Sequence, residues 1–145
     1  MHGTFENGQP KIKIEIRGNG SSQTVEAVVD SGFNGYLKIP YRTAFPLGLS
    51  LVAVGSGTVA DGNMSANLVC EGEACIGSEC ARITIDVHPA EITLIGTGLL
   101  KALSKGFYLD VTNGIVEITD IKPAEPSSKG FALKKEAGSN TISKD

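Results

Sequence analysis

The sequence predicts one mostly β domain that contains a single short helix. Apolar and polar residues alternate in short runs, as expected of half-buried strands. Glycine supplies 18 of the 145 residues and falls mainly between these runs, where turns are expected. Because 41% of the residues are hydrophobic, a chain of this length can bury one core of ordinary size.

Charge and hydropathy argue against two classes of partner. The formal net charge is -3, and no basic block offers the electrostatic footprint that nucleic-acid binding requires. No segment approaches the roughly 20 apolar residues that span a bilayer, and residues 1–20 contain no apolar run of signal-peptide length. We therefore expect a cytoplasmic protein that binds neither nucleic acid nor membrane.

The composition changes near Ile121. The predicted domain covers residues 1–121. Residues 122–145 are expected to form a flexible C-terminal tail, because prolines, glycines and serines interrupt any period there. Five of the 13 basic and three of the 16 acidic residues fall in this tail, so the domain alone has a net charge of -5.

The strands are predicted from apolar alternation. Isoleucines at positions 12, 14 and 16 alternate with charged residues, and Val25, Ala27 and Val29 form a second such strand. Further strands are expected at residues 36–39, 51–54, 67–74, 81–87 and 92–95. Residues 41–49 contain Pro46 and Gly48, so a loop or short turn is expected there.

Turn signals predict two hairpins. Asp61-Gly62 predicts a long projecting arm between the strands that flank it. Asn113-Gly114 predicts a two-residue turn between strands at 107–111 and 115–118.

One helix is expected after residue 96. Thr97 is expected to cap its N-terminal amides, and Leu99, Leu100 and Leu103 provide an apolar stripe. Lysines near the C-terminal end suit the helix dipole. Gly106 is expected to supply the left-handed residue that ends the helix.

The three cysteines form an odd set with a spacing of five residues. Cys70, Cys75 and Cys80 match neither a disulfide framework nor the two-residue spacing of zinc knuckles. We expect reduced thiols, with a redox or metal role as the alternative.

The run Asp30-Ser31-Gly32 follows an apolar strand and carries the strongest chemical signal. An aspartic protease needs two carboxylates about 3 Å apart that share one proton, a small hydroxylated residue that locks the turn, and a glycine that lets the backbone approach the shared water. The run supplies one set of these groups. Its alternative interpretation is ordinary turn chemistry, since all three residue types favour turns.

Three further segments, in order, give the chain a family resemblance. Asp30-Ser31-Gly32-Phe33-Asn34-Gly35 leads into Tyr36-Leu37-Lys38-Ile39-Pro40; Ala60-Asp61-Gly62 follows, and Leu94-Ile95-Gly96 then leads into Leu99-Leu100. Over about residues 11–118 the chain thus resembles the retropepsin-like aspartic proteases of clan AA, particularly the small single-domain prokaryotic members. The resemblance implies an acid-protease-like β-barrel, closed or partly open, that forms a homodimer.

The resemblance also implies roles for individual residues. Asp30 would be the catalytic carboxylate, Ser31 would bond across the dimer axis, and Gly32 would shape the loop. Substrate-binding positions carried over from the family are Phe33, Asn34, Gly35, Ala60, Asp61 and Gly62. Phe33 departs from the retroviral members, which usually have alanine there, and this leaves the subsite shapes and substrate preference open.

The implied function is an aspartic endopeptidase that acts on a peptide or protein substrate. The sequence contains no second Asp-Ser-Gly or Asp-Thr-Gly, so a symmetric homodimer would supply the missing carboxylate most simply. The alternative is a dimeric peptide-binding or interaction module of the same fold with weak or no proteolytic activity.

Other sites are poorly supported by the sequence. Asp86, His88 and Ser31 could in principle form a serine-hydrolase triad, but no Gly-x-Ser-x-Gly elbow exists. Ile95-Gly96-Thr97-Gly98 lacks the third glycine of a dinucleotide loop. The histidines and acids have no metal-ligand spacing, so neither a metal nor a cofactor is expected.

Overall fold

The structure is a computed structural model that describes residues 1–58 and 64–121, without the side chains of residues 56–66. The predicted tail at 122–145 and the predicted Ala60, Asp61 and Gly62 lie outside the described residues. Among the helices described, none is long and apolar enough to cross a bilayer.

The described chain is mostly β, as predicted. The strands are β1 (Thr4–Glu6), β2 (Gln9–Arg17), β3 (Ser22–Val29), β4 (Leu37–Pro40), β5 (Ser50–Thr58), β6 (Met64–Ile76), β7 (Glu79–His88), β8 (Leu94–Ile95), β9 (Lys105–Asp110) and β10 (Ile115–Asp120). Two short helices, α1 (Tyr41–Leu47) and α2 (Thr97–Ala102), interrupt them.

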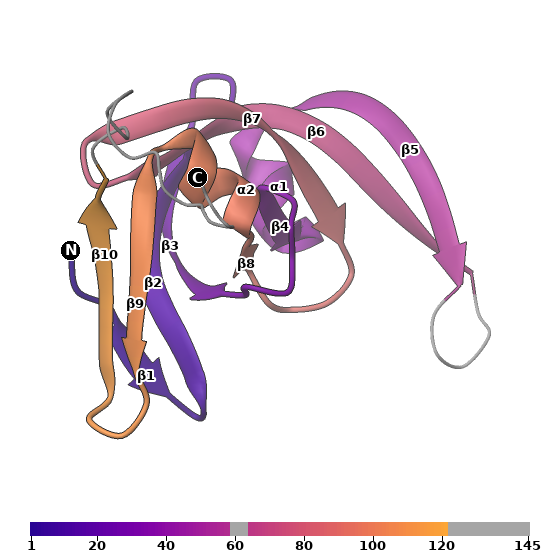
Figure 1. The fold of residues 1–145 in the computed structure, drawn as a ribbon. Helices are drawn as coiled ribbons and strands as arrows, with labels where there is room; N and C mark the ends of the chain where they lie inside the picture. Colours follow the sequence, from indigo (N-terminus) through magenta and orange to yellow (C-terminus); the bar gives the residue numbers. More distant parts are fainter. Residues whose placement is uncertain (59–63, 122–145) are drawn as a thin grey trace, which may run out of the picture.

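Eight strands form one sheet in the order β1-β2-β3-β8-β4-β7-β6-β5, and β9 and β10 form a second. A short additional pairing joins β2 to β6, from Glu15↔Cys75 to Arg17↔Glu73. The large sheet therefore curls partly into a ring, while β5 and the far half of β6 project as an arm (Figure 1). The expected sheet is confirmed, as a partial ring and not a barrel.

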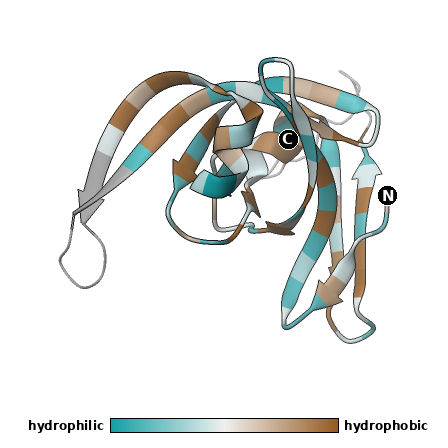
Figure 2. Ribbon diagram, turned by 180° about the vertical axis from the view of Figure 1, so that it is seen from behind, coloured by the Kyte–Doolittle hydropathy of each residue, from teal (hydrophilic) through white to brown (hydrophobic). Residues whose placement is uncertain are grey.

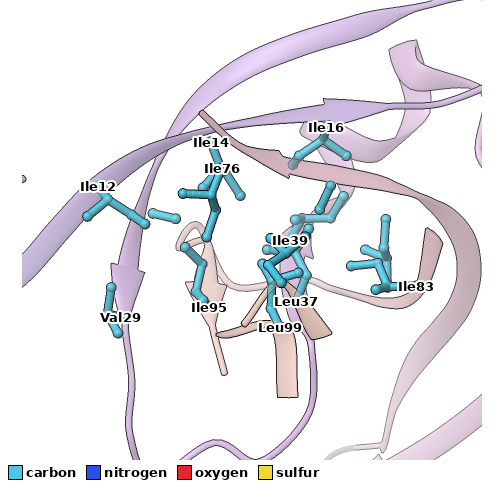
Figure 3. Close-up of a cluster of buried hydrophobic side chains, with 14 of the residues drawn as sticks. Ile12, Ile14, Ile16, Val29, Leu37, Ile39, Ile76, Ile83, Ile95 and Leu99 are labelled. Carbon is cyan, nitrogen blue, oxygen red and sulfur yellow. The ribbon is translucent and has the colours of Figure 1, made fainter. Parts of the chain in front are cut away.

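The core lies on the inner face of this curled sheet. Ile12, Ile14 and Ile16 of β2 are each no more than 2% exposed, as their period of two predicts. Hydrophobic and hydrophilic bands alternate along the long strands (Figure 2). The isoleucines of β2 belong to one buried cluster with Leu37 of β4 and Leu99 of α2 (Figure 3). Burying each such side chain contributes about 1.5–3 kcal/mol to folding.

The predicted loop at residues 41–49 is wrong, because α1 forms there. Pro46 lies in the last turn of α1, close to its C-terminal end. Gly48 then adopts a left-handed conformation with φ +66°, and its N–H donates to the Phe45 carbonyl at 3.3 Å. The glycine that suggested a loop therefore serves as the stop signal of a short helix.

The helix at residue 97 is confirmed, but both of its predicted ends are wrong. Gly96 and not Thr97 occupies the N-cap position, and no side chain caps the helix. The helix ends at Ala102, and Ser104 takes the positive φ of 54° that was expected of Gly106. Gly106 instead lies within β9.

The C-terminal hairpin is confirmed, with a longer loop than predicted. Ile115 pairs with Asp110, so residues 111–114 form a four-residue loop instead of a two-residue turn. The Asp110 carboxylate explains the difference, because it accepts bonds from the backbone N–H of Asn113 at 3.1 Å and from its side-chain amide at 2.8 Å. These bonds hold the pKa of Asp110 below its usual value.

Lys105 ties this hairpin to the turn between β6 and β7. Its ammonium pairs with both Asp120 and Glu79, and its side chain is only 9% exposed. The bond to Asp120 raises the pKa of Lys105 and lowers that of Asp120. On the other edge of β10, the Gly3 N–H donates to the Val116 carbonyl at 2.9 Å.

The expectation of three reduced thiols is wrong for two of them. Cys75 and Cys80 are direct partners across the β6–β7 ladder and form a disulfide. A spacing of five residues brought them together because a tight turn reverses the chain at Gly77, which has φ +62°. Only Cys70 is free, and burial raises the pKa of its thiol. Because disulfides persist in oxidising compartments, this bond does not favour the cytoplasmic location, which stays a prediction.

The disulfide predicts the number of cysteines that an alkylating reagent labels. In denaturant without reductant, one label per chain is expected, on Cys70, because the other two sulfurs are bonded to each other. After reduction, three labels are expected. Mass spectrometry of the intact chain reads both numbers, and three labels before reduction would contradict the disulfide.

Candidate active site in the Asp30 loop

The Asp30 loop, residues 30–36, leaves the end of β3 and enters β4. Its first turn is closed by two bonds to Asp30: the Gly32 N–H donates to the carboxylate Oδ1 at 2.9 Å, and the Phe33 N–H donates to the carbonyl at 3.1 Å. This is the turn that an aspartate followed by a small residue and glycine favours. Asp30 is half-buried, whereas Ser31 and Gly32 are exposed. One carboxylate oxygen is thus bound in the turn at the protein surface.

β8 holds both ends of the loop. This two-residue strand lies between β3 and β4, parallel to β3 and antiparallel to β4. The Asp30 N–H donates to the Ile95 carbonyl at 2.9 Å, and the Gly96 N–H donates to the Tyr36 carbonyl at 3.1 Å. Since Ile95 is fully buried, the position of Asp30 is fixed by the core.

The start of α2 supports the middle of the loop. The Thr97 N–H donates to the Phe33 carbonyl at 2.8 Å, and the Gly98 N–H donates to the Gly35 carbonyl at 3.0 Å. Loop and helix approach so closely that a Cβ at Gly96 would lie 2.2 Å from the Gly35 oxygen. The two glycines after Ile95 therefore serve backbone packing, which agrees with rejecting them as a nucleotide-binding loop.

Phe33 occupies a defined place beside Asp30. Its ring lies against the backbone of Gly35 and Gly96, where an added Cβ would come within 2.6 and 2.7 Å of ring atoms. The Lys38 ammonium lies 5.0 Å from the ring centroid, a cation–π geometry. The departure from the family pattern at this position is thus matched by two glycines and a lysine.

A row of side chains crosses the sheet from β3 to β5 on the face opposite the core; we call it the transverse row. Each member pairs directly with the next through the registers of six neighbouring strands. In spatial order the row is Val28, Leu94, Lys38, Asp86, Val69 and Ala53. Sequence reasoning could not join Asp86 to Lys38, because the two lie 48 positions apart and only the β4–β7 pairing makes them neighbours.

A pocket of about 410 Å³ opens at the β3 end of the transverse row. Its wall includes Val28, Ile92 and Thr93, together with charged side chains from β2, β3 and α1. Asp30 does not line it, so the pocket lies beside the carboxylate and not around it.

The other candidate sites from the sequence are not assembled as catalytic centres. His88 Nε2 lies 3.1 Å from the Ile92 carbonyl oxygen, a contact that closes the loop between β7 and β8. Ligand atoms of Glu73, Cys75 and Cys80 lie within 4.8 Å of one another, a grouping that could hold a metal only if the disulfide were reduced. Glu73 is also paired with Arg17 at 3.3 Å.

Of the predicted site residues, the structure brings six together in one loop: Asp30, Ser31, Gly32, Phe33, Asn34 and Gly35. The strands that flank Ala60, Asp61 and Gly62 form the predicted hairpin arm, since β5 pairs with β6 from Ser50↔Glu71 to Thr58↔Met64. Among the described residues, Asp30 makes no ion pair.

Comparison with known proteins supports the fold alone. No protein-family model matches the chain, and no curated protein matches its sequence. A solved structure of EIAV protease, in complex with the inhibitor HBY-793, is similar with a TM-score of 0.53 and 12% sequence identity. The match covers 72% of this chain and 96% of that chain. The chain therefore has a retropepsin-like fold.

The close approach at Gly96 predicts a large loss of stability on substitution. Gly96→Ala would force the Asp30 loop and α2 apart, because the added Cβ meets backbone oxygens of residues 35 and 33 at 2.2 and 2.6 Å. We expect a loss of about 2–4 kcal/mol in the free energy of unfolding, measured by urea denaturation at fixed chain concentration.

Gly55→Ala is the matched control, because the nearest atom to its Cβ would be the Asn67 oxygen at 4.0 Å. It should change the free energy of unfolding by less than about 1 kcal/mol. Equal effects of the two substitutions would contradict the packing role of Gly96.

Proposed function

We propose that the protein is an aspartic endopeptidase whose active site forms between two Asp30 loops in a homodimer. The observation that carries this proposal is the anchoring of Asp30. Its half-exposed carboxylate accepts a bond from the Gly32 N–H, and the two ends of its loop are bonded to the backbone of the buried residues Ile95 and Gly96. The retropepsin-like fold supports the same assignment.

The chemistry needs two such loops. Two carboxylates about 3 Å apart cannot both ionise, so they share one proton. The ionised carboxylate then takes a proton from a water, which attacks the peptide carbonyl, while the protonated carboxyl donates to the carbonyl oxygen. Ser31, exposed beside Asp30, would bond across the two-fold axis, and Gly32 would leave room for the water.

The hairpin arm gives the peptide a second wall. β5 and β6 project from the body (Figure 1), and each contributes one residue to the transverse row, Ala53 and Val69. An extended peptide between this arm and the Asp30 loop could bond its main chain to the strands of the arm. The predicted contacts of Ala60, Asp61 and Gly62 with substrate belong to this proposal.

The second sheet offers a surface for dimerisation. β9 pairs with β10 on one edge, and its other edge has no strand partner among the described residues. Tyr108 on β9 is 53% exposed, and Val111 in the adjoining loop is 60% exposed. We propose that the free edges of two β9 strands pair, since an open strand edge is a ready template for another chain.

Removing the carboxylate tests the chemistry. Asp30→Asn should reduce cleavage of a peptide library to background while leaving the mass in light scattering at about twice 15.1 kDa. Glu6→Gln, which removes one negative charge from an exposed carboxylate on β1, should leave cleavage intact. Cleavage that survives Asp30→Asn would reject Asp30 as the catalytic group. Peptide binding by wild-type protein without cleavage would instead favour the alternative, a binding module of the same fold.

Mixed dimers test whether one site uses two chains. Equal amounts of wild-type and Asp30→Asn chains, unfolded together and refolded, should show about one quarter of the activity of wild-type protein at the same total chain concentration. Random pairing leaves about one quarter of the dimers with two intact chains, and only these are expected to work. The control mixture of wild type and Glu6→Gln should keep full activity. Retention near one half would mean that each chain acts alone.

A further inference from the structure

We propose that Asp86 selects peptides that carry a basic side chain near the cleaved bond. The proposal rests on the proposed function, because it assigns substrate preference to the same site. It names a residue of the transverse row that is separate from the Asp30 loop in sequence and has no part in the proposed chemistry.

The position of Asp86 follows from strand register. Asp86 pairs with Lys38 on β4 and with Val69 on β6, and Lys38 pairs with Leu94 on β8. Directly opposed residues share a face of the sheet. The neighbouring row, which includes Ile85 and Ile95, points into the core, so Asp86 points away from the core.

Lys38 connects the transverse row to the Asp30 loop. The Lys38 ammonium lies over the Phe33 ring, and Phe33 is the third residue after Asp30. The row runs from β3, the strand that leads into the Asp30 loop, to β6 and β5 of the hairpin arm, so we place a peptide held between the loop and the arm along this row. Asp86 lies three strand spacings from β3, about 14 Å, which an extended peptide covers in about four residues.

The charges along the row leave one group unsatisfied. Lys38 is engaged by the Phe33 ring, and Glu71, two residues from Val69 on β6, faces Arg82 at 3.8 Å. The ring of His88, on the same face as Asp86, contacts the Ile92 carbonyl. Asp86 makes no hydrogen bond or ion pair with any described residue, although it is half-buried.

A half-buried carboxylate that has no bonding partner gains from a cationic group on a ligand. Val69 on one side reduces local solvation, which strengthens a charge-assisted bond to an ammonium or guanidinium group. Lys38 on the other side is held away by Phe33 and forms no ion pair with Asp86 among those described. The negative charge of the domain as a whole also attracts basic peptides.

Substrate series with one varied position test the preference. Peptides that are cleaved would be remade with Lys, norleucine or Glu at each of the four positions on either side of the cleaved bond. At one of these positions, wild type should cleave the Lys peptide with about tenfold higher kcat/KM than the norleucine peptide. Asp86→Asn should abolish the difference, and Asp86→Lys should favour Glu at that position.

Glu6→Gln is the matched control, because it removes one negative charge from exposed β1 and should keep the preference for Lys. A merely structural role of Asp86 would lower all activities together and would not reverse the preference. Equal kcat/KM for the Lys and norleucine peptides at every position in wild type would overturn the proposal.

Binding to the Asp30→Asn variant separates this proposal from the proposed function. Fluorescence anisotropy measures the binding of the same peptides and needs no cleavage. If wild type cleaves no library member, a generic series of decapeptides that each carry one Lys, norleucine or Glu replaces the peptides derived from cleaved substrates. Tighter binding of the Lys peptides that is lost in the Asp30→Asn, Asp86→Asn double variant supports the role of Asp86 even if wild type proves inactive. Cleavage without any preference that depends on Asp86 overturns this proposal alone, and failure to bind or cleave any peptide overturns both.

Discussion

The insertion of β8 between β3 and β4 is the constraint on which the rest of the site depends. Two residues, Leu94 and Ile95, bring a late segment of the chain between two early strands. The Ile95 carbonyl accepts from the Asp30 N–H, and the next residue, Gly96, donates to the Tyr36 carbonyl, so both ends of the Asp30 loop are bound. The buried Ile95 side chain anchors this segment in the core. The proposed chemistry needs a carboxylate that is held in place, and the hydrophobic core holds Asp30 through main-chain bonds.

Close packing around that insertion explains the unusual loop. Gly96 and Gly98 let α2 lie directly on the Asp30 loop, and the absence of side chains at Gly35 and Gly96 leaves a surface for the Phe33 ring. Lys38 covers the ring from β4. Phe33 therefore belongs to a matched set of residues, and the set links the loop to the transverse row in which Asp86 lies.

Local signals account for the elements that were predicted correctly and for the errors at their ends. Period-two alternation located β2 and β3 because one face of each strand is buried. The ends of α2 were misplaced because Gly96 and Ser104 take conformations imposed by the loop and by β9, which composition does not show. The disulfide was missed because spacing alone cannot show that Cys75 and Cys80 oppose each other across a hairpin.

The sequence by itself determined the β class, the candidate carboxylate and every described strand except β1, since alternation and the Asp30-Ser31-Gly32 turn are local properties. Tertiary structure alone decided what surrounds that carboxylate. Ile95 lies beside Asp30, and Asp86 lies opposite Lys38, only because strands that are distant in the chain pair with one another. Such register depends on how a whole sheet buries its apolar face, and no short stretch of sequence contains that information.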